Sequence, residues 1–240
     1  MDLTTKGLAL RATDYKENDK FVVLYTPEYG KISVHARGIR KATAKLRFAA
    51  DQFCFGDYEL ACGGDRYTLK NCQQISSFYA LREDIVAYYA ACCIDECILN
   101  CTEEGQSEPQ LFVETLRALE ALVDGKQPLV VVARFMLAFL QCEGFKLDFS
   151  RCSVCGEKSR RMYVDIARGV TCEACRGAES IAVSPIVATS LTMLDNVPYD
   201  KLSSFNFTLD CQKDVLQLLS KYVANVFYPL KSVAELVKLA

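Results

Sequence analysis

The alternation of apolar and polar residues changes along the chain near residue 81. Before that point, short runs alternate apolar and polar positions and end at turn residues such as Pro27, Gly30 and Gly63-Gly64. This pattern is typical of β-strands. It predicts five strands, over residues 8–14, 20–26, 31–37, 52–60 and 66–78.

Five short strands with this turn spacing favour a small β-barrel or a β-sandwich. A short helical piece is predicted over residues 42–50, between the third and fourth strands. An OB-fold carries its one helix at that position, so the OB-fold is our first choice among small barrels.

From residue 81 onward the apolar positions recur at helical spacing. Helices are predicted from about residue 81 to 101, over 110–123 and over 129–142, the last apolar on nearly all sides and therefore the buried centre of a bundle. Ser184-Pro185 is a cap and first-turn pair for a helix to about Leu194. Asp210 is the expected cap of a helix to about Phe227, and Ser232 that of a last short helix.

The predicted fold class is therefore α+β. Residues 1–80 form an N-terminal OB-fold β-barrel, and residues 81–240 form a mostly α-helical domain. A cysteine-containing segment, residues 150–180, interrupts the helical domain.

The composition is ordinary for a soluble globular protein, with 51% hydrophobic and 24% charged residues. The longest apolar run, 129–140, contains Arg134 and is too short to span a bilayer, so no membrane association is expected. The first residues lack the apolar core of a signal peptide, which indicates a cytoplasmic protein. Thirteen cysteines, an odd number, then indicate a reducing compartment, with free thiols that are candidate metal ligands.

Four of the cysteines have the spacing of a zinc site. Cys152, Cys155, Cys172 and Cys175 form two C-x-x-C pairs separated by sixteen residues, within the zinc-ribbon range. Residues 162–171 between the pairs resemble a hairpin with its turn at Arg168-Gly169, which would bring the second pair back to the first.

Four thiolates leave no open position on a zinc ion, whereas catalytic zinc needs one. The single histidine, His35, has no glutamate two residues later and so does not match a zinc deaminase. The predicted Zn²⁺ is therefore structural, and no enzymatic activity is expected.

Cys93, Cys97 and Cys101 share one helix face and either hold a second metal or are buried as small apolar side chains. Cys54, Cys62 and Cys72 fall in strands and are expected to be buried in the same way.

Positive charge is concentrated in the N-terminal part. Residues 1–80 carry twelve Lys/Arg and nine Asp/Glu, whereas residues 81–240 carry sixteen and twenty-one. The stretch 29–50 has no acidic residue and six basic ones: Lys31, Arg37, Arg40, Lys41, Lys45 and Arg47. Such a stretch is either a solvated loop or a site for nucleic-acid phosphates. Nearby aromatic residues could stack on bases: Tyr25, Tyr29, Phe48, Phe53 and Phe55.

The succession of these parts resembles the RecO family, the bacterial recombination mediators of DNA repair. The resemblance lies in "GLALRATDYKENDKFVVLYTPEYGKISVHARGIRK", "FCFGDYEL", "FMLAFLQCEGF", "CSVCG", "RGVTCEAC" and "YPLKSVAEL", which together cover essentially the whole chain. It implies an OB-fold that binds single- and double-stranded DNA and anneals complementary strands. It also implies a partnership with RecR in loading RecA onto DNA covered by single-strand-binding protein, and contact with the C-terminal tail of that protein.

Residue by residue, the resemblance assigns zinc ligation to Cys152, Cys155, Cys172 and Cys175. It assigns DNA contact to positions on or near Arg37, Arg40, Lys41, Lys45 and Arg47, and it implies a cytoplasmic, nucleoid-associated bacterial protein. Two other functions stay open: a zinc-containing protein–protein adaptor with little direct DNA contact, and a zinc hydrolase.

Overall fold

The computed structural model describes residues 2–64 and 66–240, and the chain forms two compact units. The barrel unit comprises residues 1–80 and 102–113, and the helical unit comprises 81–101 and 114–240. Residues 102–113 belong to the barrel unit, and this segment forms hydrogen bonds with the start of the third strand and with the turn before it. Gly105 N–H donates to the carbonyl of Lys31 (3.0 Å), and the Ser107 hydroxyl donates to the carbonyl of Pro27 (2.8 Å).

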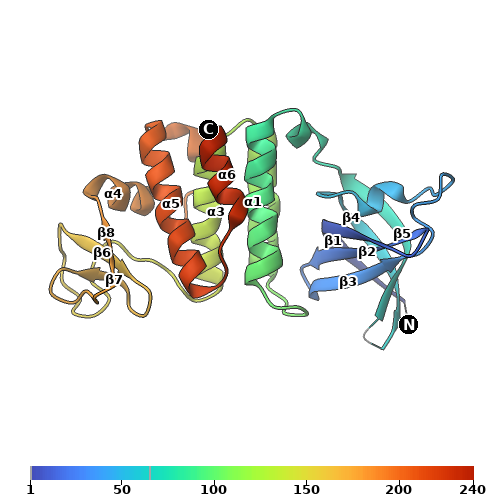
Figure 1. Cartoon of the computed structure of the whole chain (residues 1–240), viewed down its shortest axis with the longest axis horizontal. Coiled ribbons are helices and arrows are strands. Elements are labelled where there is room, and N and C mark those ends of the chain that lie inside the picture. The colour runs from blue at the N-terminus through green and yellow to red at the C-terminus, as the bar shows by residue number, and fades with distance from the viewer. Residues whose placement is uncertain (1, 65) are drawn as a thin grey trace. The chain divides into compact units, whose positions relative to one another are not determined.

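Five strands close into a barrel in the order β1-β2-β3-β5-β4. Figure 1 labels these strands. All neighbouring pairs are antiparallel except β3 and β5, which close the barrel through a short parallel pairing. The prediction of an N-terminal OB-like barrel is therefore confirmed. The strands are β1 (Asp2–Tyr15), β2 (Asp19–Thr26), β3 (Gly30–Ala36), β4 (Phe55–Gly63) and β5 (Arg66–Ser76).

The period-two pattern of the strands fills the barrel interior. Val22 and Leu24 of β2 lie opposite Val34 and Ile32 of β3, and all four side chains are buried. The residues between them in sequence face outward, because successive side chains of a strand point to opposite sides. Gly7 of β1 leaves room for this core, since a Cβ there would lie 2.7 Å from the side chain of Leu24.

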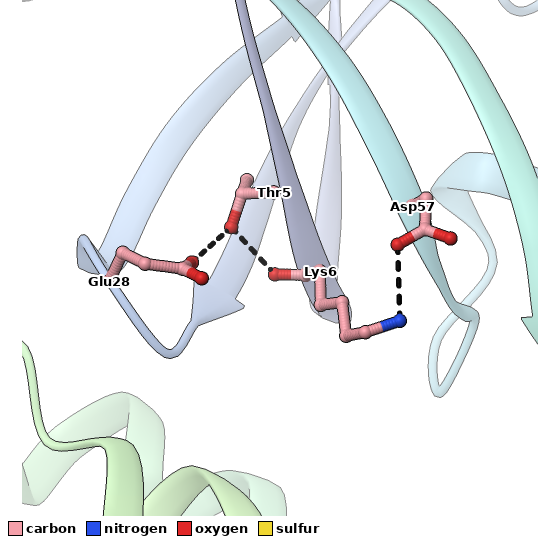
Figure 2. Close-up of polar contacts among 4 residues, drawn as sticks. All are labelled: Thr5, Lys6, Glu28 and Asp57. Carbon is pink, nitrogen blue, oxygen red and sulfur yellow. Dashed lines mark hydrogen bonds and ion pairs between the residues drawn. The ribbon is translucent and has the colours of Figure 1, made fainter.

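Polar contacts hold the β2–β3 turn and β4 against β1 (Figure 2). The buried Thr5 hydroxyl of β1 lies 2.6 Å from the carboxylate of Glu28, in the β2–β3 turn. Its neighbour Lys6 forms an ion pair with Asp57 of β4, with 3.3 Å between the charged atoms. The charge of Lys6 is therefore neutralised by a carboxylate on the adjacent strand.

The region between β3 and β4 differs from the prediction. Only Arg47–Ala50 is helical, as a single 3-10 turn, and residues 37–46 form consecutive turns. The residue before this turn, Leu46, forms no side-chain hydrogen bond that would cap it. β4 begins at Phe55 rather than at residue 52, because Phe53 adopts a left-handed backbone (φ 68°) and donates its N–H to the carbonyl of Ala9 (2.8 Å).

The helical unit contains five helices of eight or more residues within the described part of the chain. They are α1 (Ile85–Cys101), α3 (Pro128–Cys142), α4 (Pro185–Leu194), α5 (Leu209–Val226) and α6 (Lys231–Leu239). α2 (Pro109–Val123) begins in the barrel unit and continues in the helical unit. α3 contacts α1 and α5, and residues 129–140 are all buried, which confirms the predicted central helix (Figure 1). None of the helices in the described residues is both long enough and apolar enough to cross a membrane.

The one charged residue of α3 is neutralised inside the helical unit. Arg134 is 6% exposed, and its guanidinium lies 3.3 Å from the carboxylate of Glu114 in α2. Its Nε donates to the carbonyl of Val197 (2.8 Å), and the ring of Tyr199 lies 5.1 Å from its guanidinium carbon. A buried arginine is tolerated here because its charge is paired with a carboxylate and its Nε donates to a carbonyl.

Two predicted helix caps are wrong and one is confirmed. The Ser184 hydroxyl accepts from the Val187 N–H at the start of α4, as expected. α5 is capped by Thr208, whose hydroxyl accepts from the Cys211 N–H, so Asp210 lies inside the first turn. There its negative charge is favourable to the helix dipole. α6 follows Leu230, which places Ser232 inside the helix as well.

Candidate metal centre and nucleic-acid interface

The cysteine segment folds as a small three-stranded sheet. The strands are β6 (Met162–Asp165), β7 (Gly169–Cys172) and β8 (Ile181–Val183), in the order β7-β6-β8 (Figure 1). Met162 pairs with Cys172 and Asp165 with Gly169, so β6 and β7 form the predicted hairpin with residues 166–168 as its turn. The hairpin places the second cysteine pair beside the first.

The four predicted ligands come together. The sulfur atoms of Cys152, Cys155, Cys172 and Cys175 all lie within 4.8 Å of one another, and those of Cys155 and Cys172 are 3.8 Å apart. A tetrahedron with Zn–S distances of about 2.3 Å has sulfur–sulfur edges of about 3.8 Å. The donor set and its spacing therefore fit a tetrahedral zinc ion. The bound ion would cross-link the two knuckles, and four sulfurs would fill its coordination shell.

Backbone hydrogen bonds shape the first cysteine knuckle. Gly156 adopts a left-handed backbone (φ 76°), which a side chain disfavours, and donates its N–H to the carbonyl of Cys152 (2.9 Å). The N–H of Ser153 donates to the carbonyl of Val170 in β7 (2.8 Å). The knuckle is thus attached directly to the hairpin that carries the second pair.

Asp165 supports the other side of the cluster. Its carboxylate accepts from the N–H groups of Ala167, Arg168 and Gly177 and from the hydroxyl of Ser180. Burial acts to raise the pKa of Asp165, but these donors outweigh burial and the pKa is lowered. The carboxylate therefore stays ionised and links the β6–β7 turn to the residues that follow Cys175.

The pKa values of the cluster thiols are shifted in opposite directions. Backbone N–H groups, first that of Cys155, lower the pKa of Cys152 to about 6. Hydrogen bonds from Cys175 to the sulfurs of Cys172 and Cys155 raise its pKa to about 12. The thiolate of Cys152 is stabilised by the protein alone. Ionisation of a second thiol in the cluster would place two negative charges close together, which is unfavourable. A divalent cation is what would favour the fully deprotonated set.

The other cysteines do not form a comparable group. Within residues 2–64 and 66–240, the four-cysteine cluster is the one set of potential metal ligands that meets this geometry. Cys93, Cys97 and Cys101 are buried along α1, and burial raises the pKa of Cys93 to about 12 and also raises that of Cys97. Cys54 and Cys72 are buried in the barrel unit, whereas Cys62 is half-buried. The buried ones, Cys54, Cys72, Cys93, Cys97 and Cys101, pack as small apolar groups.

Five of the six predicted DNA-contacting residues lie on one exposed segment, which we call the basic loop (residues 37–47). Arg37, Arg40, Lys41, Lys45 and Arg47 are all exposed. Two turns organise the loop, since Lys41 N–H donates to the carbonyl of Gly38 (3.1 Å) and Ala44 N–H donates to that of Lys41 (3.0 Å). The loop also bonds to the β1–β2 turn, where Arg40 N–H donates to the carbonyl of Asn18 (3.0 Å).

A groove of about 580 Å³ lies under the basic loop. Its walls include the cationic residues Arg37, Lys41 and Lys45. Apolar side chains of Ile39, Leu46 and Leu69 line it as well. Cations beside an apolar lining suit a ligand that combines phosphate with a flat aromatic ring, as a nucleotide does.

Lys31 does not belong to this surface, which corrects its predicted role. It is 6% exposed, and its ammonium donates to the carbonyl of Thr102 (2.7 Å) inside the barrel unit. The sequence pattern around Lys31 does not reveal its burial, because its partner Thr102 lies 71 residues away in sequence.

Arg40 of the basic loop forms an ion pair with an acidic residue. Its guanidinium lies 3.3 Å from the carboxylate of Asp14, at the end of β1. Asp14 is also 3.7 Å from the ammonium of Lys20, so one carboxylate faces two cations. The pair is exposed, and water screens it, so a phosphate can compete for the arginine.

The predicted stacking aromatics are for the most part internal to the barrel unit. Tyr25 and Phe53 are buried, and the ring of Phe55 packs 6.2 Å from that of Phe112 in α2. Tyr29 is exposed. Neither Tyr25 nor Phe53 can meet a base without unfolding the barrel, which corrects the expectation for these two residues.

Two family models match this chain one after the other. The family model described as "Recombination protein O N terminal" matches residues 1–78, and "Recombination protein O C terminal" matches residues 82–233.

Three relatives are each named DNA repair protein RecO. That of Clostridium novyi is 29% identical over 93% of this chain and 88% of its own length. That of Bacillus pumilus is 28% identical over 92% and 88%. That of Alkaliphilus metalliredigens is 30% identical over 79% and 78%. With an OB-like barrel, a helical unit and both family models matched in order, this chain belongs to the RecO family.

Proposed function

We propose that this chain is a DNA repair and recombination mediator that binds single- and double-stranded DNA and anneals complementary strands. The observation that carries the proposal is the basic loop: five exposed cations, with no acidic residue in the loop, on the surface of an OB-like barrel. Lysine and arginine on a nucleic acid displace condensed counterions, which provides affinity without sequence preference. A mediator that acts on any sequence needs that kind of contact.

The four-cysteine cluster supports a structural rather than a catalytic role for a bound metal ion in this proposal. Four cysteine sulfurs close the coordination shell of a zinc ion, so no position is left for water or substrate. We therefore propose that the chain is not an enzyme and that its work is to hold DNA and partners. Membership of the RecO family makes RecR and the C-terminal tail of single-strand-binding protein the proposed partners, in the bacterial cytoplasm at the nucleoid.

The first test measures the affinity of the full-length protein for a labelled single-stranded oligonucleotide by fluorescence anisotropy across a salt series. The variant combines Arg37→Ala, Arg40→Ala, Lys41→Ala and Arg47→Ala. We expect at least a tenfold loss of affinity at low salt. The plot of log K against log salt should become shallower by up to about 3, since each phosphate contact on a single strand contributes about 0.7.

The matched control removes four exposed lysines from the helical unit, Lys201, Lys221, Lys231 and Lys238, by substitution to alanine. It changes the net charge by the same amount and should leave affinity and salt slope close to those of the unaltered protein. Equal losses in both variants would show that only net charge matters, and an unchanged basic-loop variant would refute the placement of the DNA site.

A further inference from the structure

We propose that Tyr15, Phe21 and His35 form a base-stacking platform on the outer face of β1, β2 and β3, and that it receives the unpaired bases of single-stranded DNA. The proposal rests on the proposed function and deepens it, because it assigns the contact that distinguishes a single strand from a duplex.

The strand register places the three rings side by side. Phe21 of β2 pairs directly with His35 of β3, and Tyr15 ends β1 opposite Asp19 at the start of β2. Val22 and Val34, their sequence neighbours, are buried in the barrel. Because side chains alternate along a strand, Phe21 and His35 face outward.

The rings contact one another as a continuous group. The ring centroids of Phe21 and His35 are 5.0 Å apart with 24° between the planes, which is a stacked arrangement. The ring of Tyr15 lies 4.8 Å from that of Phe21 and 5.6 Å from that of His35. Tyr15 is 38% exposed, and the other two rings are half-buried. The Tyr15 ring is tilted by 60° from that of Phe21 and meets that of His35 at 83°, so it borders the stacked pair, and a base arriving from solvent would contact this exposed ring first.

The platform and the basic loop are joined by one carboxylate. Asp19 accepts from the N–H of Gly38 (2.7 Å) and lies 2.9 Å from Nε2 of His35. Its two oxygens thus hold the loop and the histidine ring in a fixed relation. Two cations lie beside the rings. The ammonium of Lys16 lies over the face of the Tyr15 ring, 5.2 Å from its centre, where a base would replace it, and the guanidinium of Arg40 donates to the carbonyl of Lys16 (3.4 Å).

This arrangement matches a single strand better than a duplex. Cations that follow a backbone beside rings that accept bases are the two parts of single-strand recognition. The bases of a duplex are already stacked and paired, so only the cations can contact it. A cross-strand aromatic group could also serve stability alone, and the experiment must separate these two roles.

The test compares a 20-nucleotide single strand with the corresponding duplex, by anisotropy at one low salt concentration and over a salt series. The variant combines Tyr15→Leu and Phe21→Leu, which keep apolar bulk and remove the rings. We expect single-strand affinity to fall about tenfold or more, since stacking on one aromatic ring accounts for about that factor per base. Duplex affinity and the salt slopes should not change. A 2-aminopurine base in the single strand should lose its binding-dependent quenching.

Three controls keep the result interpretable. Tyr15→Phe combined with Phe21→Tyr retains both rings and should restore single-strand affinity. Tyr79→Leu removes an exposed tyrosine elsewhere and should have no effect. Tyr15→Leu alone alters an exposed position and should fold normally even if the double variant does not.

Unchanged single-strand affinity in the folded leucine variants would overturn the platform while the proposed DNA-binding function stands. Equal loss for single strand and duplex would also overturn it, because that result would indicate a displaced basic loop. Failure of the unaltered protein to bind either DNA would instead overturn the proposed function.

Discussion

Side chains of the same type have different environments in this protein. Lys31 and Arg37 lie six residues apart on one basic stretch, yet Lys31 is buried against a carbonyl and Arg37 is exposed. Asp19 is exposed in part, but both of its carboxylate oxygens have partners. The roles of individual residues in the proposed DNA site therefore depend on tertiary contacts that the local sequence does not reveal.

Asp19 provides a pH-dependent prediction. The Gly38 N–H, acting against the effect of desolvation and together with His35 and Lys16, lowers the pKa of Asp19 below its usual 3.8. A lowered carboxyl pKa means that the stabilising contact is complete above pH 3.8 and is lost as the pH falls through the folded-state value. The amide resonance of Gly38 should therefore titrate with a midpoint below 3.8 in a two-dimensional NMR series.

Asp19→Asn should abolish that titration. The amide of Ala44, which donates to a backbone carbonyl in the same loop, serves as a reference that should not follow it. A Gly38 midpoint at or above 3.8 would contradict the anchoring contact.

The N-terminus of α6 is capped by a residue of another helix. α6 has no side-chain cap from its own preceding residue, Leu230. Glu96 of α1 takes that place, because its carboxylate accepts from the N–H groups of Lys231 (3.1 Å) and Ser232 (2.8 Å) and from the Ser232 hydroxyl. A negative charge at a helix N-terminus is also favoured by the helix dipole. The packing of α6 on α1 is thereby tied to a specific register.

Glu96→Gln should destabilise the helical unit by about 1–2 kcal/mol, because a charged acceptor of several donors becomes a neutral amide with one acceptor atom. The measurement is the urea midpoint of the far-ultraviolet circular dichroism signal. Glu120→Gln, at an exposed position of α2, is the matched control and should change the midpoint little. Equal midpoints for the two variants would refute a capping role for Glu96.

The residues proposed to bind DNA and those proposed to bind the metal lie in different units of the chain. The cations proposed to hold DNA belong to the barrel unit, and the four cysteines belong to the helical unit. Because a structural zinc site couples metal binding to folding, the ion is expected to act on stability and not on DNA contact.

Metal removal tests this division. The purified protein should contain one zinc per chain, and treatment with a strong chelator should lower its thermal midpoint by several degrees. DNA affinity should remain within about twofold when measured below that midpoint, since the basic loop does not depend on the ion. Cys172→Ser should lower the zinc content, whereas Cys62→Ser in the barrel should retain it. A zinc-free protein with an unchanged midpoint would contradict a structural role.

Local patterns were sufficient for the features that depend on local interactions. Alternation identified the strands, helical spacing identified α1 to α3, and the C-x-x-C pairs with an intervening hairpin predicted the cluster that the structure brings together. These features were predictable because a strand face, a helix face or a tight turn is set by residues a few positions apart.

Tertiary structure alone decided the remainder. The burial of Lys31 depends on Thr102, the cap of α6 on Glu96, and the ring group of Tyr15, Phe21 and His35 on the register of three strands. Each of these contacts joins residues that are distant in the chain or paired by a register that no local motif encodes. Their partners become adjacent only when the barrel closes and the helices pack, which is why they were not visible in the pattern of single segments.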